Sequence, residues 1–207
     1  MRLLHKELNV EKSEILYHKE FTDEVLDRDF EIKGGKWVAE NGWLTGENPE
    51  NCPGMILLRK NFSGNVMLDF EAATVLPCTH DINVMWNGSW NEEKNMRDVA
   101  YVAGIQGWWH GKVGFEKSPE YKLNVATQIF DFQPGKIYRV QTGSIDGHIF
   151  VVIDGRLVLE VTDPDPIDSS KYGRIGFEAY CSKLRFRNFY VRRPYWERTE
   201  EKYIPEF

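Results

Sequence analysis

Two Asp-Gly pairs in quick succession restrict the fold more than any other feature of this sequence. Asp146-Gly147 and Asp154-Gly155 separate three short segments in which apolar and polar residues alternate. The three segments are 137–145, 148–153 and 156–162. A period of two is typical of strands with one buried face, and an Asp-Gly pair between such runs favours a tight hairpin turn. This region therefore predicts a three-stranded antiparallel meander.

Strand-like patterns continue through most of the 207 residues, with turn residues between them. Segments with this pattern are 55–61, 66–75, 81–86, 121–127, 174–180 and 184–191. Only 22–29 favours a short helical turn, and 87–98 is polar enough for a lid or rim loop. Many short strands without a long helical period predict an all-β fold. We expect one antiparallel β-sandwich of two sheets, a jelly roll, over residues 1–207.

Composition excludes several classes of partner and compartment. The net charge of −6 argues against binding to nucleic acid or to an anionic membrane surface. The sequence has no run of apolar residues long enough for a transmembrane helix or a signal peptide. Cys52, Cys78 and Cys181 are odd in number and widely spaced, which favours free thiols in a reducing compartment. We therefore expect a cytoplasmic protein.

The stretch 99–118 is the strongest candidate for a binding site. Trp108, Trp109 and His110 are adjacent there, between glycines and polar side chains. Aromatic rings can cover the apolar face of a sugar while amides and charges bind its hydroxyls. In the alternative interpretation, one of these tryptophans belongs to the core and His110 lies at a rim. The catalytic candidates are His110, Glu116 and Glu178. The substrate-binding candidates are Asn83, Trp86, Tyr101, Gln106, Trp108, Trp109, Lys122, Asn124 and Tyr180.

We expect no metal and no other cofactor. Asp163, Asp165 and Asp168 offer oxygen ligands, but two prolines interrupt them and no EF-hand pattern is present. The histidines have no metal-binding spacing, and no nucleophile elbow or phosphate-binding loop occurs. The aromatic and charged residues of 192–207 predict a C-terminal strap, which packs either on this domain or on a second subunit in a homodimer.

The second half of the chain resembles a known group of folds. Its closing strands contain YRVQ (138–141), GHIFVVIDGRLVLE (147–160), GRIGF (173–177) and LRFRNFYV (184–191). These runs are similar to the last strands of concanavalin A-like lectin/glucanase domains, which implies the same jelly roll. Within that group the chain most resembles the YesU-like family over 55–193, on Tyr101, Gly104, Ile105, Lys117-Ser118, Tyr121 and Leu123. It is more distantly similar to the 3-keto-disaccharide hydrolase domain.

These resemblances imply a carbohydrate-active protein, which the expected cytoplasmic location makes an intracellular one. We expect a lyase or hydrolase that takes a small, oxidised or unsaturated sugar in the concave face of the sandwich. The E-x-D-x-x-E strand of laminarinase-type glucanases is missing, so the carboxylate pair of a retaining glycosidase cannot be assigned. A non-catalytic carbohydrate-binding module is the alternative, and a structural, dimerising sandwich is a further one.

Overall fold

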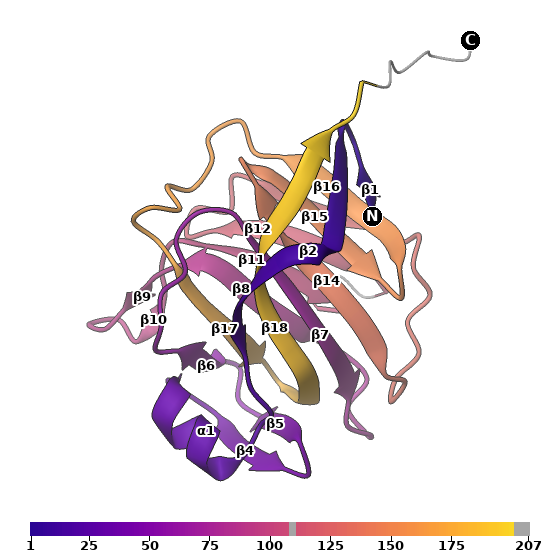
Figure 1. Cartoon of the computed structure of the whole chain (residues 1–207). Coiled ribbons are helices and arrows are strands. Elements are labelled where there is room, and N and C mark those ends of the chain that lie inside the picture. Colours follow the sequence, from indigo (N-terminus) through magenta and orange to yellow (C-terminus); the bar gives the residue numbers. More distant parts are fainter. Residues whose placement is uncertain (108–110, 201–207) are drawn as a thin grey trace.

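Two antiparallel sheets stack face to face in the computed structural model, which describes residues 1–107 and 111–200 (Figure 1). In the first sheet the strand order is β1-β2-β18-β7-β14-β15-β16, with β5 paired to β18 and β4 paired to β5. In the second sheet it is β13-β12-β11-β8-β17-β6-β3. All the sheet pairings are antiparallel. The predicted all-β sandwich is therefore confirmed.

The first sheet contains the strands from both ends of the described chain. Its strands are β1 (Arg2–Leu3), β2 (Lys6–His18), β4 (Lys36–Glu40), β5 (Trp43–Asn48), β7 (Val66–Thr74), β14 (Tyr138–Ile145), β15 (His148–Ile153), β16 (Arg156–Thr162) and β18 (Ser182–Arg198). The second sheet consists of β3 (Phe30–Ile32), β6 (Gly54–Leu58), β8 (Ile82–Gly88), β11 (Ala100–Ile105), β12 (Val113–Ser118), β13 (Asn124–Thr127) and β17 (Arg174–Ala179).

The predicted meander is formed by β14, β15 and β16. Ile145 pairs with His148 and Ile153 pairs with Arg156, so each Asp-Gly pair is a two-residue hairpin loop. Asp146, Gly147, Asp154 and Gly155 all have φ between 49° and 79°. Positive φ at both loop residues is the requirement of the hairpin turn whose twist matches the strands.

Aromatic side chains from both sheets fill the space between them. Phe177 of the second sheet stacks on Phe186 of the first, with ring centroids 4.1 Å apart. Phe70 meets Phe177 edge-on at 5.5 Å. These rings are almost completely buried. Their removal from water is a main source of the stability of the sandwich.

The helix α1 (Asp23–Asp29) lies at one end of the sandwich, beside β4 and β5 (Figure 1). The Thr22 hydroxyl caps it by accepting a hydrogen bond from the amide of Val25, and Val25 and Leu26 face the core. No helix among the described residues is both long and apolar enough to cross a membrane.

The predicted C-terminal strap is part of a strand as far as Arg198. Tyr195–Arg198 of β18 pair with Lys6–Asn9 of β2 in the same chain. Residues 201–207 lie outside the described part, and a homodimer stays a prediction. Cys52, Cys78 and Cys181 are free thiols, as predicted.

A small ribbon covers part of the outward face of the second sheet. It consists of β9 (Trp90–Asn91) and β10 (Met96–Arg97), within the segment predicted as a rim loop. Trp90 packs on an apolar cluster of that face, made of Met55, Leu57, Met85, Ala100 and Val102. The ribbon therefore brings Arg97 over the sheet, next to the part of the face that is polar.

Candidate functional site

A pocket of about 460 Å³ opens on the polar part of this outward face. We call it the sheet pocket. It is lined by Pro53, His80, Asp81, Asn83, Arg97, Val102, Gly107, Glu116, Tyr121, Glu178, Tyr180 and Cys181. Its volume falls within the roughly 300–1,000 Å³ that is usual for small-molecule sites.

Strand register explains why three of the predicted site residues meet here. Asn83 of β8 pairs directly with Glu178 of β17. Glu116 of β12 pairs with Val102 of β11, which pairs with Met85 of β8. Side chains of directly paired residues point to the same face of a sheet, so Asn83, Glu116 and Glu178 share the outward face.

Arg97 joins the two glutamates from above the sheet. Its Nη1 lies 2.5 Å from Glu178 Oε2 and its Nη2 lies 2.8 Å from Glu116 Oε1. Its Nε donates a hydrogen bond to the Ser118 hydroxyl at 3.0 Å. The three charged side chains are only 7–12% exposed. One cation therefore compensates two largely buried carboxylates.

Burial and mutual charge change the acidity of this group. Burial lowers the pKa of Arg97, but the negative charges of Glu178 and Glu116 together raise it by more. The net pKa is therefore above the usual value, and the guanidinium stays charged. Burial raises the pKa of Glu116; Arg97 lowers it, Glu178 raises it, and the net pKa is above the usual range. The Glu116 carboxyl can therefore carry a proton more readily than an exposed glutamate.

Asp81 directly precedes β8 and has a left-handed backbone conformation, with φ of 79°. Its Oδ1 accepts a hydrogen bond from Asn83 Nδ2 at 2.8 Å. Among the described residues, neither Asp81 Oδ2 nor Asn83 Oδ1 has a hydrogen-bond partner, although both atoms are buried. Buried polar atoms are normally paired. Two unpaired acceptors in a pocket wall are therefore suited to the donors of a ligand.

The pKa of Asp81 is raised to about 7, first by burial and then by the negative charge of Glu178. A carboxyl group with this pKa exchanges protons near neutral pH, which is what general acid–base catalysis requires. Asp81, Asn83, Arg97, Glu116 and Glu178 thus combine a proton carrier, a fixed cation and an unpaired amide oxygen. Among the described residues, no group of His, Cys, Asp or Glu has the arrangement of a metal site.

The structure brings together four of the predicted site residues and places others elsewhere. Asn83, Glu116, Glu178 and Tyr180 line the sheet pocket. Gln106 lies beside it, where its backbone oxygen accepts a hydrogen bond from the Asp81 amide at 3.0 Å. Lys122 pairs with Glu120 at an exposed position, and Asn124 is exposed on the edge strand β13. Trp108, Trp109 and His110 lie outside the described residues and stay predictions.

Trp86 and Tyr101 face the interior of the sandwich instead of the pocket. Trp86 is completely buried, and its Nε1 donates a hydrogen bond to the Ser144 hydroxyl at 3.1 Å. The Tyr101 hydroxyl donates to Asp163 Oδ2 at 2.8 Å and accepts from the Ile167 amide at 2.9 Å. Both side chains join the sheet to neighbouring elements, and neither lines the sheet pocket.

We therefore predict that Tyr101→Phe affects stability and leaves the sheet pocket intact. The substitution leaves a buried amide and a buried carboxylate oxygen without the phenol, which costs about 1–3 kcal/mol. Urea unfolding should show this loss, while ligand binding should remain that of the unmodified protein. A Tyr101→Phe variant of normal stability that no longer binds ligand would contradict this assignment.

Sequence reasoning missed Arg97, Asp81, His80 and Tyr121, which also line the pocket. Arg97 is the only arginine in the polar segment 87–98, and an arginine in a predicted rim loop is a signal that could have been used. His80 precedes the predicted strand 81–86 and Asp81 is its first residue, a position where polar residues are common. Nothing in the sequence marks Asp81 as a buried residue.

Comparison with known proteins supports a carbohydrate-related fold. The model of the 3-keto-alpha-glucoside-1,2-lyase-like domain family matches residues 11–192, in agreement with one of the two resemblances stated above. No curated protein sequence matches the chain.

Solved structures with the same fold include three bacterial proteins. The carbohydrate-binding module CBM66 from Bacillus subtilis has a TM-score of 0.63 at 15% identity, with 79% of this chain and 95% of that chain covered. A protein of unknown function with a galectin-like fold, also from Bacillus subtilis, has a TM-score of 0.67 at 14% identity, with 87% and 96% covered. A Parabacteroides distasonis protein provisionally named a glycosyl hydrolase has a TM-score of 0.53 at 12% identity, with 88% and 99% covered.

Proposed function

Since the chain belongs to the 3-keto-alpha-glucoside-1,2-lyase-like domain family, we propose that the sheet pocket binds a 3-keto glucoside and cleaves its glycosidic bond by elimination. The observation that carries this proposal is Asp81, a buried carboxyl group with a pKa of about 7 and an unpaired oxygen. The predicted lyase is thereby preferred over the predicted hydrolase.

A 1,2-lyase that acts on a 3-keto glucoside breaks the C1–O bond and forms a C1=C2 double bond. A ketone at C3 makes the hydrogen on C2 acidic, because the electron pair left at C2 delocalises onto the ketone oxygen. A base removes that proton. The electron pair then forms a C1=C2 double bond while the C1–O bond breaks, and the departing oxygen takes a proton. The products are a 1,2-unsaturated 3-keto sugar and a free alcohol.

Asp81 is the proposed base for the C2 proton. With a pKa of about 7, a substantial fraction of the side chain is ionised near neutral pH, and its basicity exceeds that of an ordinary aspartate. Asn83 holds Oδ1 by its amide, so that Oδ2 is left for the substrate. A base fixed in this way loses little orientational freedom on reaction.

Arg97 is the proposed group that stabilises negative charge on the C3 oxygen. It remains positively charged because two carboxylates surround it, and it sits in a largely buried site where charge acts strongly. Glu116 has a raised pKa and is the proposed donor of a proton to the departing oxygen. His110 remains a predicted alternative donor, and Trp108 and Trp109 remain a predicted sugar platform.

A carbohydrate-binding role without catalysis is the second candidate. The specific observation in its favour is that Arg97 already has a partner for each of its three nitrogens. The two carboxylates that Arg97 holds in place can accept hydrogen bonds from the hydroxyl groups of a sugar without any reaction. The likeness in fold to a carbohydrate-binding module fits this reading as well.

A single incubation separates these alternatives. We would mix the protein with p-nitrophenyl 3-keto-α-glucoside in deuterium oxide, with the unoxidised glucoside as control. Elimination predicts that nitrophenol is released from the keto sugar and not from the unoxidised control. The sugar product should be unsaturated or, if water has added to it, should carry deuterium at C2. Hydrolysis without deuterium at C2 would show a hydrolase. Saturable binding without release would show a binding module, and neither binding nor release would overturn both candidates.

A further inference from the structure

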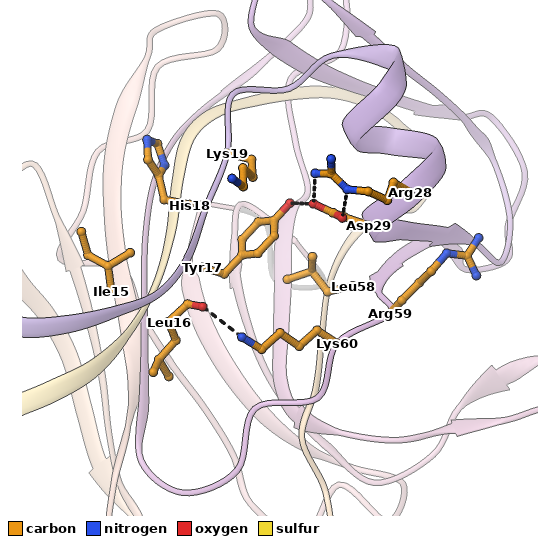
Figure 2. Close-up of a pocket in the computed structure, with 10 residues that line it drawn as sticks. All are labelled: Ile15, Leu16, Tyr17, His18, Lys19, Arg28, Asp29, Leu58, Arg59 and Lys60. Atoms are coloured by element: carbon orange, nitrogen blue, oxygen red, sulfur yellow. Dashed lines mark hydrogen bonds and ion pairs between the residues drawn. The ribbon is translucent and has the colours of Figure 1, made fainter.

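A second pocket, of about 660 Å³, shares no lining residue with the sheet pocket. It lies where three elements end: β2 at His18, α1 at Asp29 and β6 at Leu58 (Figure 2). We call it the cationic pocket, because Lys19, Arg28, Arg59 and Lys60 line it together with a single acidic residue, Asp29. The chain as a whole has a net charge of −6, so the positive charge of this pocket contrasts with the charge of the rest of the protein.

Only one of the four cations is neutralised by Asp29. Arg28 Nε and Nη2 bind the two Asp29 oxygens at 2.7 and 3.0 Å, and Tyr17 donates its hydroxyl to Asp29 Oδ2 at 2.9 Å. The Arg28 guanidinium accordingly keeps the pKa of Asp29 below its usual range. Among the described residues, no carboxylate lies within ion-pair distance of Lys19, Arg59 or Lys60.

The wall of the pocket is an ordered aromatic and aliphatic surface. Tyr17 packs edge-on against Phe30 and Phe62, with centroids 6.3 and 6.5 Å away, and Leu58 is buried beneath it. Lys60 is held in place because its Nζ donates to the Leu16 carbonyl oxygen at 3.2 Å. Figure 2 shows Lys19 and Lys60 on opposite sides of the Tyr17 ring. The cations are therefore arranged around a surface that a ring-sized molecule can cover.

We propose that the cationic pocket binds a phosphate group, either as free phosphate or as the phosphate of a small phosphorylated sugar. A phosphate monoester carries close to two negative charges at neutral pH, which matches several uncompensated cations better than a single carboxylate does. Lysine ammonium groups bind phosphate as point charges. The Tyr17 ring offers the apolar surface that a sugar attached to the phosphate would use.

Calorimetric titration with inorganic phosphate and with glucose 6-phosphate tests this proposal, at constant ionic strength. We expect saturable binding, and about tenfold or greater weakening in K19Q/K60Q, because each substitution removes a charge-assisted contact. K36Q/K171Q is the matched control: it removes two exposed lysines outside the pocket, and its affinity should stay unchanged. Tighter binding of glucose 6-phosphate than of phosphate would assign a sugar phosphate, and equal binding would assign free phosphate.

Three results would overturn the proposal. The first is no binding of either compound by the unmodified protein. The second is equal weakening in both double variants, which would show a diffuse effect of net charge. The third is binding of glucuronate as tight as that of glucose 6-phosphate, which would show that the pocket does not select phosphate. Glu178→Gln alters only the sheet pocket and should leave phosphate affinity unaffected.

Discussion

Replacing Asp81 by asparagine is expected to lower kcat on a 3-keto glucoside by about 10²–10⁴-fold, which is the usual contribution of a general base. Asparagine keeps the size of the side chain and an oxygen that can still accept from Asn83 Nδ2, so the wall of the sheet pocket should be preserved. Substrate affinity should therefore change little. Steady-state kinetics together with calorimetric titration of a non-reacting glucoside separates these two effects.

The same variant, D81N, should be less active but more stable than the unmodified protein. In the folded protein the pKa of Asp81 is about 7, against 3.8 for an ordinary aspartate, so the folded state holds this proton more tightly than the unfolded state. The stabilising effect of this tighter proton binding is fully present below about pH 4 and is lost as the pH rises through about 7. D81N removes this loss, so it should be more stable than the unmodified protein at about pH 8, by up to roughly 4 kcal/mol.

Urea unfolding across this pH range measures the effect, with Asp131→Asn as the control at an exposed aspartate. The activity of the unmodified protein should rise with pH through about 7, because the base must be ionised. A D81N protein that is more stable at high pH and still fully active would show that Asp81 is buried and strained without being the base.

Replacing Arg97 by glutamine is expected to cause the largest loss of stability. Glu116 and Glu178 would remain buried without a compensating cation, and breaking a buried ion pair from one side costs about 3–5 kcal/mol. The loss should be greatest at about pH 8. It should shrink toward about pH 5, because Glu116, whose pKa is already raised by burial and rises further without Arg97, then takes up a proton and becomes neutral.

The triple variant R97Q/E116Q/E178Q provides the control. It removes all three charges, so it should recover much of the stability lost in R97Q while remaining inactive. Recovery of stability without activity would show that this group of three charged side chains is needed for the reaction as well as for the fold. If R97Q unfolds at the same urea concentration as the unmodified protein at high pH, the description of these carboxylates as buried and ionised is wrong.

Alternation along strands was sufficient to predict which residues face the same way. The pattern of 81–86 places Asn83 opposite Ile82, Val84 and Trp86, and the structure has Asn83 outward and Trp86 in the core. The sequence thus already separated Trp86 from Asn83, although a tryptophan near polar residues suggested a sugar platform. The aromatic character of a residue was a weaker guide than its position in the period of two.

Contacts between distant segments could not be predicted in the same way. Arg97 reaches Glu178, which lies 81 residues later, and this contact depends on β17 being the neighbour of β8 in the sheet. Strand order and the course of the β9–β10 ribbon are properties of the whole fold. The raised pKa of Asp81 has the same origin, because it results from burial and from Glu178.

The strand β18 has a consequence for the synthesis of the protein. Its 17 residues pair with β2 and β5 along one side and with β7 along the other. A ribosome therefore produces β2, β5 and β7 long before the strand that joins them. Their unpaired edges are exposed to neighbouring nascent chains in the meantime, and the first sheet can close only when residues 182–198 have emerged. Folding should accordingly be slow, because the first sheet depends on pairings between strands that lie far apart in the sequence.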